Sequence, residues 1–417
     1  MKYEFPKGFL WGAATSAHQV EGNTHNDWTE WEKNNASRLA KESRGRFGHL
    51  PNWKEVEKEA TNPQNYISGI ACDHYNRYKE DFDLAKSLGH NAHRFSIEWS
   101  RIEPEEGKFD EVAIAHYRDV VETLRERGLE PFVTLWHWTI PLWLRDKGGI
   151  LAQDFPDYFA RYAEKVVTVL KNDVTFWVTL NEPLSVIKNS YLLGNWPPQR
   201  TNPFAVWQTY KTLAKAHNLG YETIKKIMPS SKVGLANIIN FFEPDNPHSI
   251  FDKFIVKIAD YFHNRRILDL TQGKNDFIAL QYYFHDRLKF PVGRTNNNDT
   301  VSDLGWEIYP EGLCYIIKKL AVYKLPIYIT ENGISDKKDF RREKFIKENL
   351  KQISRAMSEG ADVRGYFYWS LLDNFEWDKG FWPRFGLVEI DYETLERKPR
   401  PSAYAYKKII EDNGIVD

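Results

Sequence analysis

Two glutamates stand at positions where chemistry is expected. Glu182 lies in the segment Thr-Leu-Asn-Glu-Pro and Glu331 in Ile-Thr-Glu-Asn-Gly, and each follows a short β-branched and aromatic run. Such runs predict buried strands. In a barrel of parallel strands the carboxyl ends of the strands surround one pocket, so the two carboxylates can converge although they are far apart in the chain. A pair of carboxylates in one pocket can carry out glycoside hydrolysis.

The elements that must position these glutamates repeat in the order helix, glycine, strand. Apolar residues at helical spacing over 73–88 are followed by Gly89 and by a strand candidate at 91–97. The same order recurs around Gly128 and Gly360. The strand candidates found in this way lie at 9–14, 91–97, 132–136, 175–180, 233–237, 277–283, 327–330 and 364–369.

Eight strands that alternate with helices predict an α/β fold, and specifically a (β/α)₈ (TIM) barrel. We expect residues 1–417 to form this one catalytic barrel as a single domain, because no flexible linker or low-complexity tract divides the chain. The longest gap between strand candidates, at about 15–72, contains a helical pattern over 27–41 and then a polar stretch. This gap predicts an elaborated loop over the mouth of the barrel.

Overall composition excludes some classes of binding partner and indicates a cellular compartment. The formal net charge is −1, and Lys and Arg are spread along the chain, which argues against nucleic acid or a membrane as partner. Cys72 and Cys314 cannot form a disulfide framework and lack metal-ligand spacing, so we expect structural thiols in a reducing compartment. No segment has the pattern of a signal peptide or approaches the ~20 apolar residues of a membrane helix, so a cytoplasmic protein is expected.

The residues at the ends of the predicted strands share a chemical character that a purely structural barrel would lack. They are carboxylates, amides, an arginine, a histidine and large aromatic side chains, which suit a neutral, polyhydroxylated ligand. The members are Gln19, Arg94, His137, Asn181, Glu182, Tyr283, Glu331, Trp369, Glu376 and Trp377. No phosphate-binding loop and no metal-ligand set accompanies them, so the sequence predicts neither a cofactor nor a metal.

The types of these residues predict different roles for the two glutamates. Arg94 and the Tyr283 hydroxyl would keep the carboxylate of Glu331 ionised, ready to attack an anomeric carbon. Glu182, directly after Asn181, would then have the raised pKa, protonate the leaving oxygen and later activate water.

The motifs that contain these residues also resemble a known family, the family-one glycoside hydrolases, which are retaining β-glucosidases and β-galactosidases. The resemblance extends over nearly the whole chain, and its motifs occur in family order. They are Arg-Phe-Ser-Ile-Glu-Trp-Ser-Arg (94–101), Thr-Leu-Asn-Glu-Pro (179–183), Ile-Thr-Glu-Asn-Gly (329–333) and Tyr-Trp-Ser-Leu-Leu-Asp-Asn-Phe-Glu-Trp (368–377).

Carried over by position, the resemblance implies that Glu182 is the acid/base and Glu331 the nucleophile. It implies Trp369 as the surface under the sugar ring. It further implies a group of hydrogen-bonding partners for the sugar hydroxyls, namely Gln19, His137, Asn181, Glu376 and Trp377. The carboxylate of Glu376 would repel a 6-phosphate, so non-phosphorylated glycosides are favoured.

The expected function is therefore that of an exo-acting retaining β-glycosidase, which hydrolyses β-glucosides, and with them β-galactosides or β-fucosides, through a covalent glycosyl-enzyme intermediate. Its partners would be small glycosides or short oligosaccharides. Two alternatives stay open: an enzyme that mainly transfers the sugar to acceptor alcohols, and a sugar-binding barrel with impaired catalysis.

Two departures from the family pattern bear on these alternatives. Gln281 stands where the family usually has Asn before two tyrosines, and its longer amide could shift hydrogen bonds near the nucleophile. The stretch between Asp269 and Asp276 is also much shorter than the family norm, so the side or mouth of the barrel could be more open.

Overall fold

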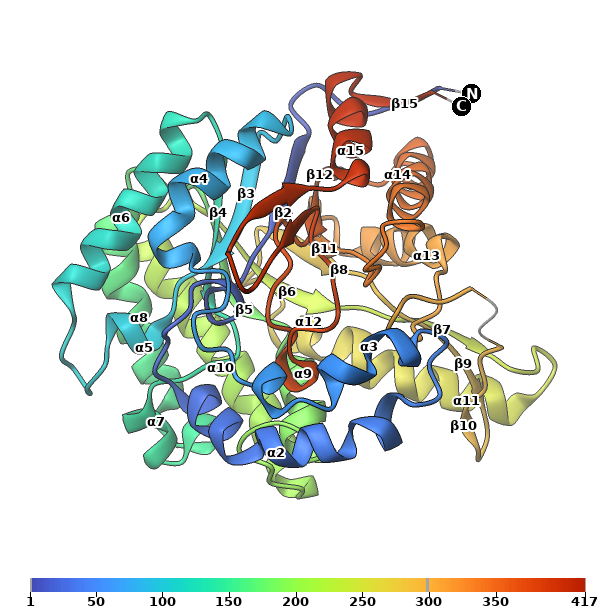
Figure 1. Cartoon of the computed structure of the whole chain (residues 1–417), viewed down its shortest axis with the longest axis horizontal. Coiled ribbons are helices and arrows are strands. Elements are labelled where there is room, and N and C mark those ends of the chain that lie inside the picture. Colours follow the sequence, from blue (N-terminus) through green and yellow to red (C-terminus); the bar gives the residue numbers. More distant parts are fainter. Residues whose placement is uncertain (1, 298–299, 417) are drawn as a thin grey trace.

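The computed structural model describes residues 2–297 and 300–416, and a closed barrel of eight parallel strands lies at its centre (Figure 1). Around the barrel the strand order is β11-β12-β2-β3-β4-β5-β6-β8. The barrel strands are β2 (Leu10–Ala14), β3 (Ala92–Ser96), β4 (Glu130–Trp136), β5 (Phe176–Asn181), β6 (Lys232–Ile238), β8 (Phe277–Gln281), β11 (Ile327–Asn332) and β12 (Val363–Trp369). All eight predicted strands are present, and the (β/α)₈ prediction is confirmed.

Helices cover the outside of the barrel, as Figure 1 shows. The longer ones are α4 (His74–Ser87), α6 (Glu111–Glu126), α8 (Phe155–Leu170), α10 (Pro203–Ile227), α13 (Pro310–Leu320), α14 (Arg342–Ser358) and α15 (Pro401–Glu411). α6 illustrates why they form. The Asp110 side chain accepts hydrogen bonds from two backbone N–H groups of the first turn, and Tyr117, Val121 and Leu124 bury one face. The chain then turns at Gly128, whose φ of 66° is in the left-handed region.

The barrel interior is a packed aromatic core rather than a channel. Phe132 lies at its centre, and the rings of Phe176, Phe277, Phe367 and Tyr328 surround it at centroid distances of 4.8, 5.3, 5.1 and 5.5 Å. This packing accounts for part of the high aromatic content of the chain. Because this core fills the inside of the barrel, open space for a ligand lies at the carboxyl ends of the strands.

The long segment after the first barrel strand is more helical than the sequence predicted. The helix expected over 27–41 is present and longer, as α2 (Asp27–Phe47), and Asn26 caps it in a capping box. The polar stretch that follows contains α3 (Trp53–Ala60) and a 3₁₀ turn, η1 (Pro63–Tyr66). These two elements were not predicted, because each is too short and has too few apolar residues to show helical periodicity.

A small sheet lies outside the barrel. It consists of β7 (Phe241–Pro244), β9 (His285–Lys289) and β10 (Gly293–Arg294), and α11 (Ile250–Ala259) and the π-helix η4 (Asp260–Arg265) follow β7 in the chain. The remaining elements are β1 (Lys2–Glu4), α1 (Ala17–Val20), α5 (Trp99–Ile102), α7 (Leu142–Asp146), η2 (Gly149–Leu151), α9 (Pro183–Val186), η3 (Ile187–Leu192), α12 (Arg266–Leu270), η5 (Ala321–Tyr323), η6 (Trp377–Lys379), β13 (Val388–Ile390), β14 (Arg397–Pro399) and β15 (Gly414–Val416). Within the described residues, no helix has both the length and the apolar character needed to cross a membrane.

Candidate active site

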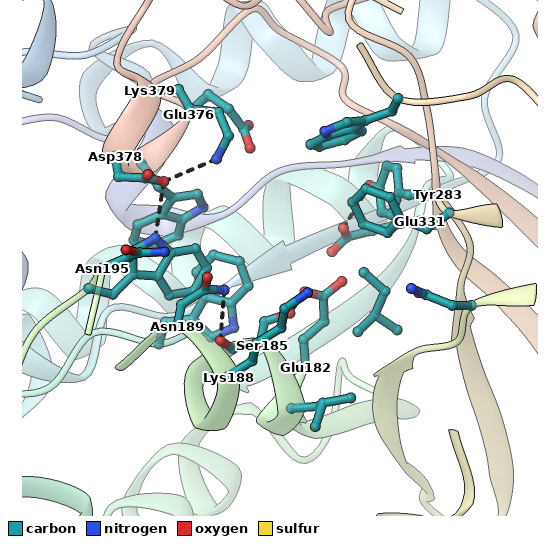
Figure 2. A pocket seen from close by; sticks show the side chains of 18 of the residues that line it. Glu182, Ser185, Lys188, Asn189, Asn195, Tyr283, Glu331, Glu376, Asp378 and Lys379 are labelled. Atoms are coloured by element: carbon teal, nitrogen blue, oxygen red, sulfur yellow. Dashed lines mark hydrogen bonds and ion pairs between the residues drawn. The ribbon is translucent and has the colours of Figure 1, made fainter. Parts of the chain in front are cut away.

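A cavity of about 500 Å³ opens at the carboxyl ends of the barrel strands. Figure 2 shows the side chains of Glu182 and Glu331 pointing into this cavity from different elements, with their carboxylates near each other. The predicted site residues that line it are Gln19, His137, Glu182, Tyr283, Glu331, Trp369, Glu376 and Trp377. The other two, Arg94 and Asn181, lie behind this lining, where each is hydrogen-bonded to a residue that lines it. The structure thus brings all ten predicted residues together.

The two glutamates reach the cavity by different backbone routes. Glu331 belongs to β11. Position 333, two residues later, requires glycine, because a Cβ there would lie 1.8 Å from the backbone oxygen of Trp369. Glu182 comes directly after β5 with φ 39°, in the left-handed region, and Pro183 then begins α9. Left-handed backbone is uncommon for a residue other than glycine and often marks a functional site.

Glu331 is surrounded by hydrogen-bond donors. Arg94 is buried beside it and forms an ion pair through Nη1 to Oε1. The Tyr283 hydroxyl donates to Oε2 at 2.9 Å, and Gln281 Nε2 donates to Oε1 at 2.7 Å. Burial raises the pKa of Glu331 above its ordinary value, but the charge and hydrogen bond of Arg94 and the Tyr283 hydroxyl oppose this rise. These donors stabilise the ionised carboxylate.

Glu182 has a less polar environment. Within the described residues, its carboxylate accepts one hydrogen bond, from the Ser185 hydroxyl to Oε2 at 2.7 Å. Burial, and after it the negative charge of Glu331, raises the pKa of Glu182 to about 8. The carboxyl group of Glu182 is therefore protonated at neutral pH when Glu331 is ionised, which is the state that a general acid needs.

A buried network connects the nucleophile candidate to a histidine at the cavity wall. Asn181 Oδ1 accepts from Arg94 Nη2 at 2.6 Å and from Gln281 Nε2 at 2.8 Å, and Asn181 Nδ2 lies 3.0 Å from His137 Nε2. Burial, together with the charge of Arg94, holds the pKa of His137 well below its ordinary value, so the ring is neutral. With Nε2 as acceptor, its proton is on Nδ1, which has no partner in the described part of the chain. This N–H can donate to a ligand hydroxyl.

Glu376 also lines the cavity, and the two tryptophans of the predicted site, Trp369 and Trp377, lie beside His137 at ring-centroid distances of 6.2 and 6.1 Å. Burial raises the pKa of Glu376 to about 7, against the opposing charge of Lys379. Gln19 is fixed by donation from Nε2 to the backbone oxygen of Phe375 at 2.8 Å. The rings of Trp369 and Trp377 both line the cavity, where flat apolar faces suit the C–H faces of a sugar.

Sequence reasoning missed the outer half of the cavity. Its lining there includes Leu184, Ser185, Lys188, Asn189, Asn195, His263, Asp286, Leu288, Arg294 and Lys379. Most of these residues come from short helices, from connections between elements and from the small outer sheet, where no strand-end pattern points to them. The shortened stretch is now seen as a turn between α12 and β8, in which Asp276 accepts from the backbone N–H of Val233 at 2.9 Å. Whether this turn opens the mouth stays a prediction.

Comparisons with known proteins all indicate the same protein family. The family model described as Glycosyl hydrolase family 1 matches residues 1–276 and 261–415. Beta-glucosidase A of Thermotoga maritima is 32% identical over 464 residues, which cover 99% of this chain and 99% of the relative. Among solved structures, a β-glycosidase from Pyrococcus horikoshii superposes with a TM-score of 0.88 at 37% identity and covers 100% of this chain and 97% of its own. A β-glucosidase from Thermotoga maritima in complex with deoxynojirimycin gives a TM-score of 0.87 at 30% identity, with 99% of this chain and 100% of that chain covered.

Proposed function

We propose, from the premise that the chain belongs to glycosyl hydrolase family 1, that it hydrolyses non-phosphorylated β-glucosides with retention of configuration. The chain is a β-glycosidase, broadly of the β-glucosidase type. The observation that carries the proposal is the unequal environment of two carboxyl groups that face one cavity (Figure 2). Arg94, Gln281 and Tyr283 all donate to Glu331. Retaining hydrolysis needs one ionised nucleophile and one protonated acid.

The proposed reaction has two steps. Glu331 attacks the anomeric carbon while Glu182 gives its proton to the leaving oxygen, so that a covalent glycosyl-enzyme forms. Glu182, now ionised, takes a proton from water, and the water displaces Glu331 from the anomeric carbon. The Nδ1–H of His137 and the amide of Gln19 would bind sugar hydroxyls during both steps.

Specificity for the non-phosphorylated sugar is proposed from Glu376. Its half-buried carboxyl group lines the cavity and would accept hydrogen bonds from the hydroxyls at the far end of the sugar. A phosphate at that end would place a second negative charge against Glu376 when its carboxyl group is ionised, which is unfavourable.

We further propose that the whole chain acts as one catalytic unit in the cytoplasm, since both of its cysteines are buried free thiols.

Stereochemistry tests the proposal. Hydrolysis of p-nitrophenyl β-glucoside is followed by proton NMR, beside the galactoside, the fucoside and the 6-phosphoglucoside as a matched panel. We expect the β-anomer of glucose as the first product and a kcat/KM for the phosphorylated substrate that is lower by at least about a hundredfold. The α-anomer as first product would reject retention, and a faster phosphorylated substrate would reject the proposed specificity.

A further inference from the structure

An apolar face on the outside of the molecule has no part in the site described above. α11 exposes Ile250, Phe251, Phe254 and Ile258, and Ile250 is 73% and Phe254 60% exposed. Phe290, in the turn between β9 and β10, is also exposed, and its ring lies 5.8 Å from that of Phe251. These five side chains are called the α11 face. In Figure 1, α11 and the β9–β10 hairpin lie together at the edge of the molecule, outside the barrel.

The orientation of α11 is fixed by a buried aspartate. Asp252 points inward, where its carboxylate accepts hydrogen bonds from the backbone N–H of Phe290 at 3.0 Å and of Asn246 at 3.1 Å. A helix at the surface of a globular protein normally buries its apolar stripe. Here, rotation of the helix to bury the phenylalanines would break both hydrogen bonds of Asp252. The α11 face is therefore held toward the outside, which is typical of a surface that meets a partner.

The charges on α11 indicate which kind of partner would bind the α11 face. Lys253 and Lys257 are exposed, lie one turn apart, and form no ion pair within residues 2–297 and 300–416. Lys289, at the end of β9, is paired with Asp245 at 3.5 Å. The free charges among the phenylalanines are thus positive. Long lysine side chains can lie along an apolar surface and extend their ammonium groups to phosphates at its border.

We propose that the α11 face docks on the surface of an anionic lipid bilayer. Apolar side chains on one face of a helix, with lysines beside them, match the chemistry of the region between lipid headgroups and acyl chains. A second copy of the chain fits less well, because a two-fold contact through this face would place the unpaired Lys253 and Lys257 of both copies in or around one apolar interface. The proposal departs from the expectation drawn from overall charge, because the charge of this face differs from the average of the chain.

Docking in this orientation would also decide how far the mouth of the cavity lies from the membrane surface. His263 in η4, Leu288 in β9 and Arg294 in β10 line its outer half, and these three elements adjoin the α11 face. The mouth of the cavity would therefore lie close to the lipid headgroups when the protein is bound.

Flotation with vesicles tests the proposal. The full-length protein is mixed with vesicles of phosphatidylcholine alone or with one part in four phosphatidylglycerol, and the bound fraction is measured after centrifugation. We expect binding to the anionic vesicles, and a decrease of at least about tenfold in the variant Phe251→Ser/Phe254→Ser/Ile258→Ser. A control variant, Val112→Ser/Phe340→Ser/Tyr404→Ser, removes three exposed apolar side chains elsewhere and should bind like the wild type.

A second variant and a mass measurement separate the competing explanations. Lys253→Glu/Lys257→Glu should weaken binding to anionic vesicles and leave hydrolysis of p-nitrophenyl β-glucoside unchanged, which shows that the variant is folded. Wild-type protein that does not float with anionic vesicles would overturn the proposal. So would a dimer mass in light scattering that becomes a monomer mass in the Phe251→Ser/Phe254→Ser/Ile258→Ser variant, because a second copy would then occupy the α11 face.

Discussion

The two sides of the cavity present the same functional group in opposite electrostatic settings. On one side Glu331 accepts hydrogen bonds from Arg94, Gln281 and Tyr283, while on the other Glu182 accepts, within the described residues, from Ser185. Both side chains are buried, so burial alone cannot distinguish them. The difference shows that the number and charge of the donors decide which of two glutamates ionises first.

Replacement of Glu182 should give the largest effect among the tests of this comparison. For Glu182→Gln we expect kcat/KM to fall by about 10²–10⁴-fold on alkyl β-glucosides, whose leaving groups need a proton. On 2,4-dinitrophenyl β-glucoside, whose leaving group needs none, the loss in kcat/KM should stay below about tenfold. Steady-state kinetics with both substrates checks this, and equal losses on the two would contradict the assignment of Glu182 as the acid.

The ion pair on the other side can be broken and partly repaired. Arg94→Leu leaves the carboxylate of Glu331 buried without its positive partner, which we expect to cost about 3–5 kcal/mol of stability. The double variant Arg94→Leu/Glu331→Gln removes the stranded charge and should recover part of this loss. Urea unfolding midpoints of the wild type, both single variants and the double variant measure the coupling. If the two substitutions act additively, the pair does not stabilise the ionised glutamate.

Gln281 offers a smaller change on the same side. Gln281→Leu removes a donor that reaches both Glu331 and Asn181, so kcat/KM should fall by about 10–100-fold. The pKa of Glu331 should rise without this donor, which moves the acid limb of the pH profile of kcat/KM to higher pH. Gln281→Asn keeps the amide and serves as the matched control, with an intermediate loss. An acid limb that stays in place would show that Gln281 only fills space.

Ser185 tests the side of Glu182 with the smallest expected effect. The wild type should lose kcat/KM as the pH rises past about 8, because Glu182 then gives up the proton that the leaving group needs. The Ser185 hydroxyl lowers this pKa, so Ser185→Ala should move the basic limb to higher pH by less than about one unit. A shift to lower pH would mean that another group controls this limb.

The sequence could predict the parts of the molecule that depend on local pattern. The strand before Glu331 was recognisable from a short β-branched run closed by Gly333, and the glutamates were predicted to meet because barrel strands end around one pocket. The resemblance placed the amide of Gln281 near the nucleophile, but its two acceptors, Glu331 and Asn181, were not predictable, since they depend on how closely β8 lies to its neighbours. The outward face of α11 was not predictable either, because an apolar helix pattern ordinarily indicates burial, whereas the exposed side chains and the contacts of Asp252 show that this helix faces outward.

The central claim is that Glu331 and Glu182 act on opposite faces of one sugar, and azide rescue tests it most directly. Glu331→Ala and Glu182→Ala are each incubated with 2,4-dinitrophenyl β-glucoside and sodium azide, and the products are identified by NMR. We predict α-glucosyl azide from Glu331→Ala, where azide takes the place of the nucleophile, and β-glucosyl azide from Glu182→Ala, where azide opens the glycosyl-enzyme. The same anomer from both variants, or unchanged turnover in Glu331→Ala, would contradict the account.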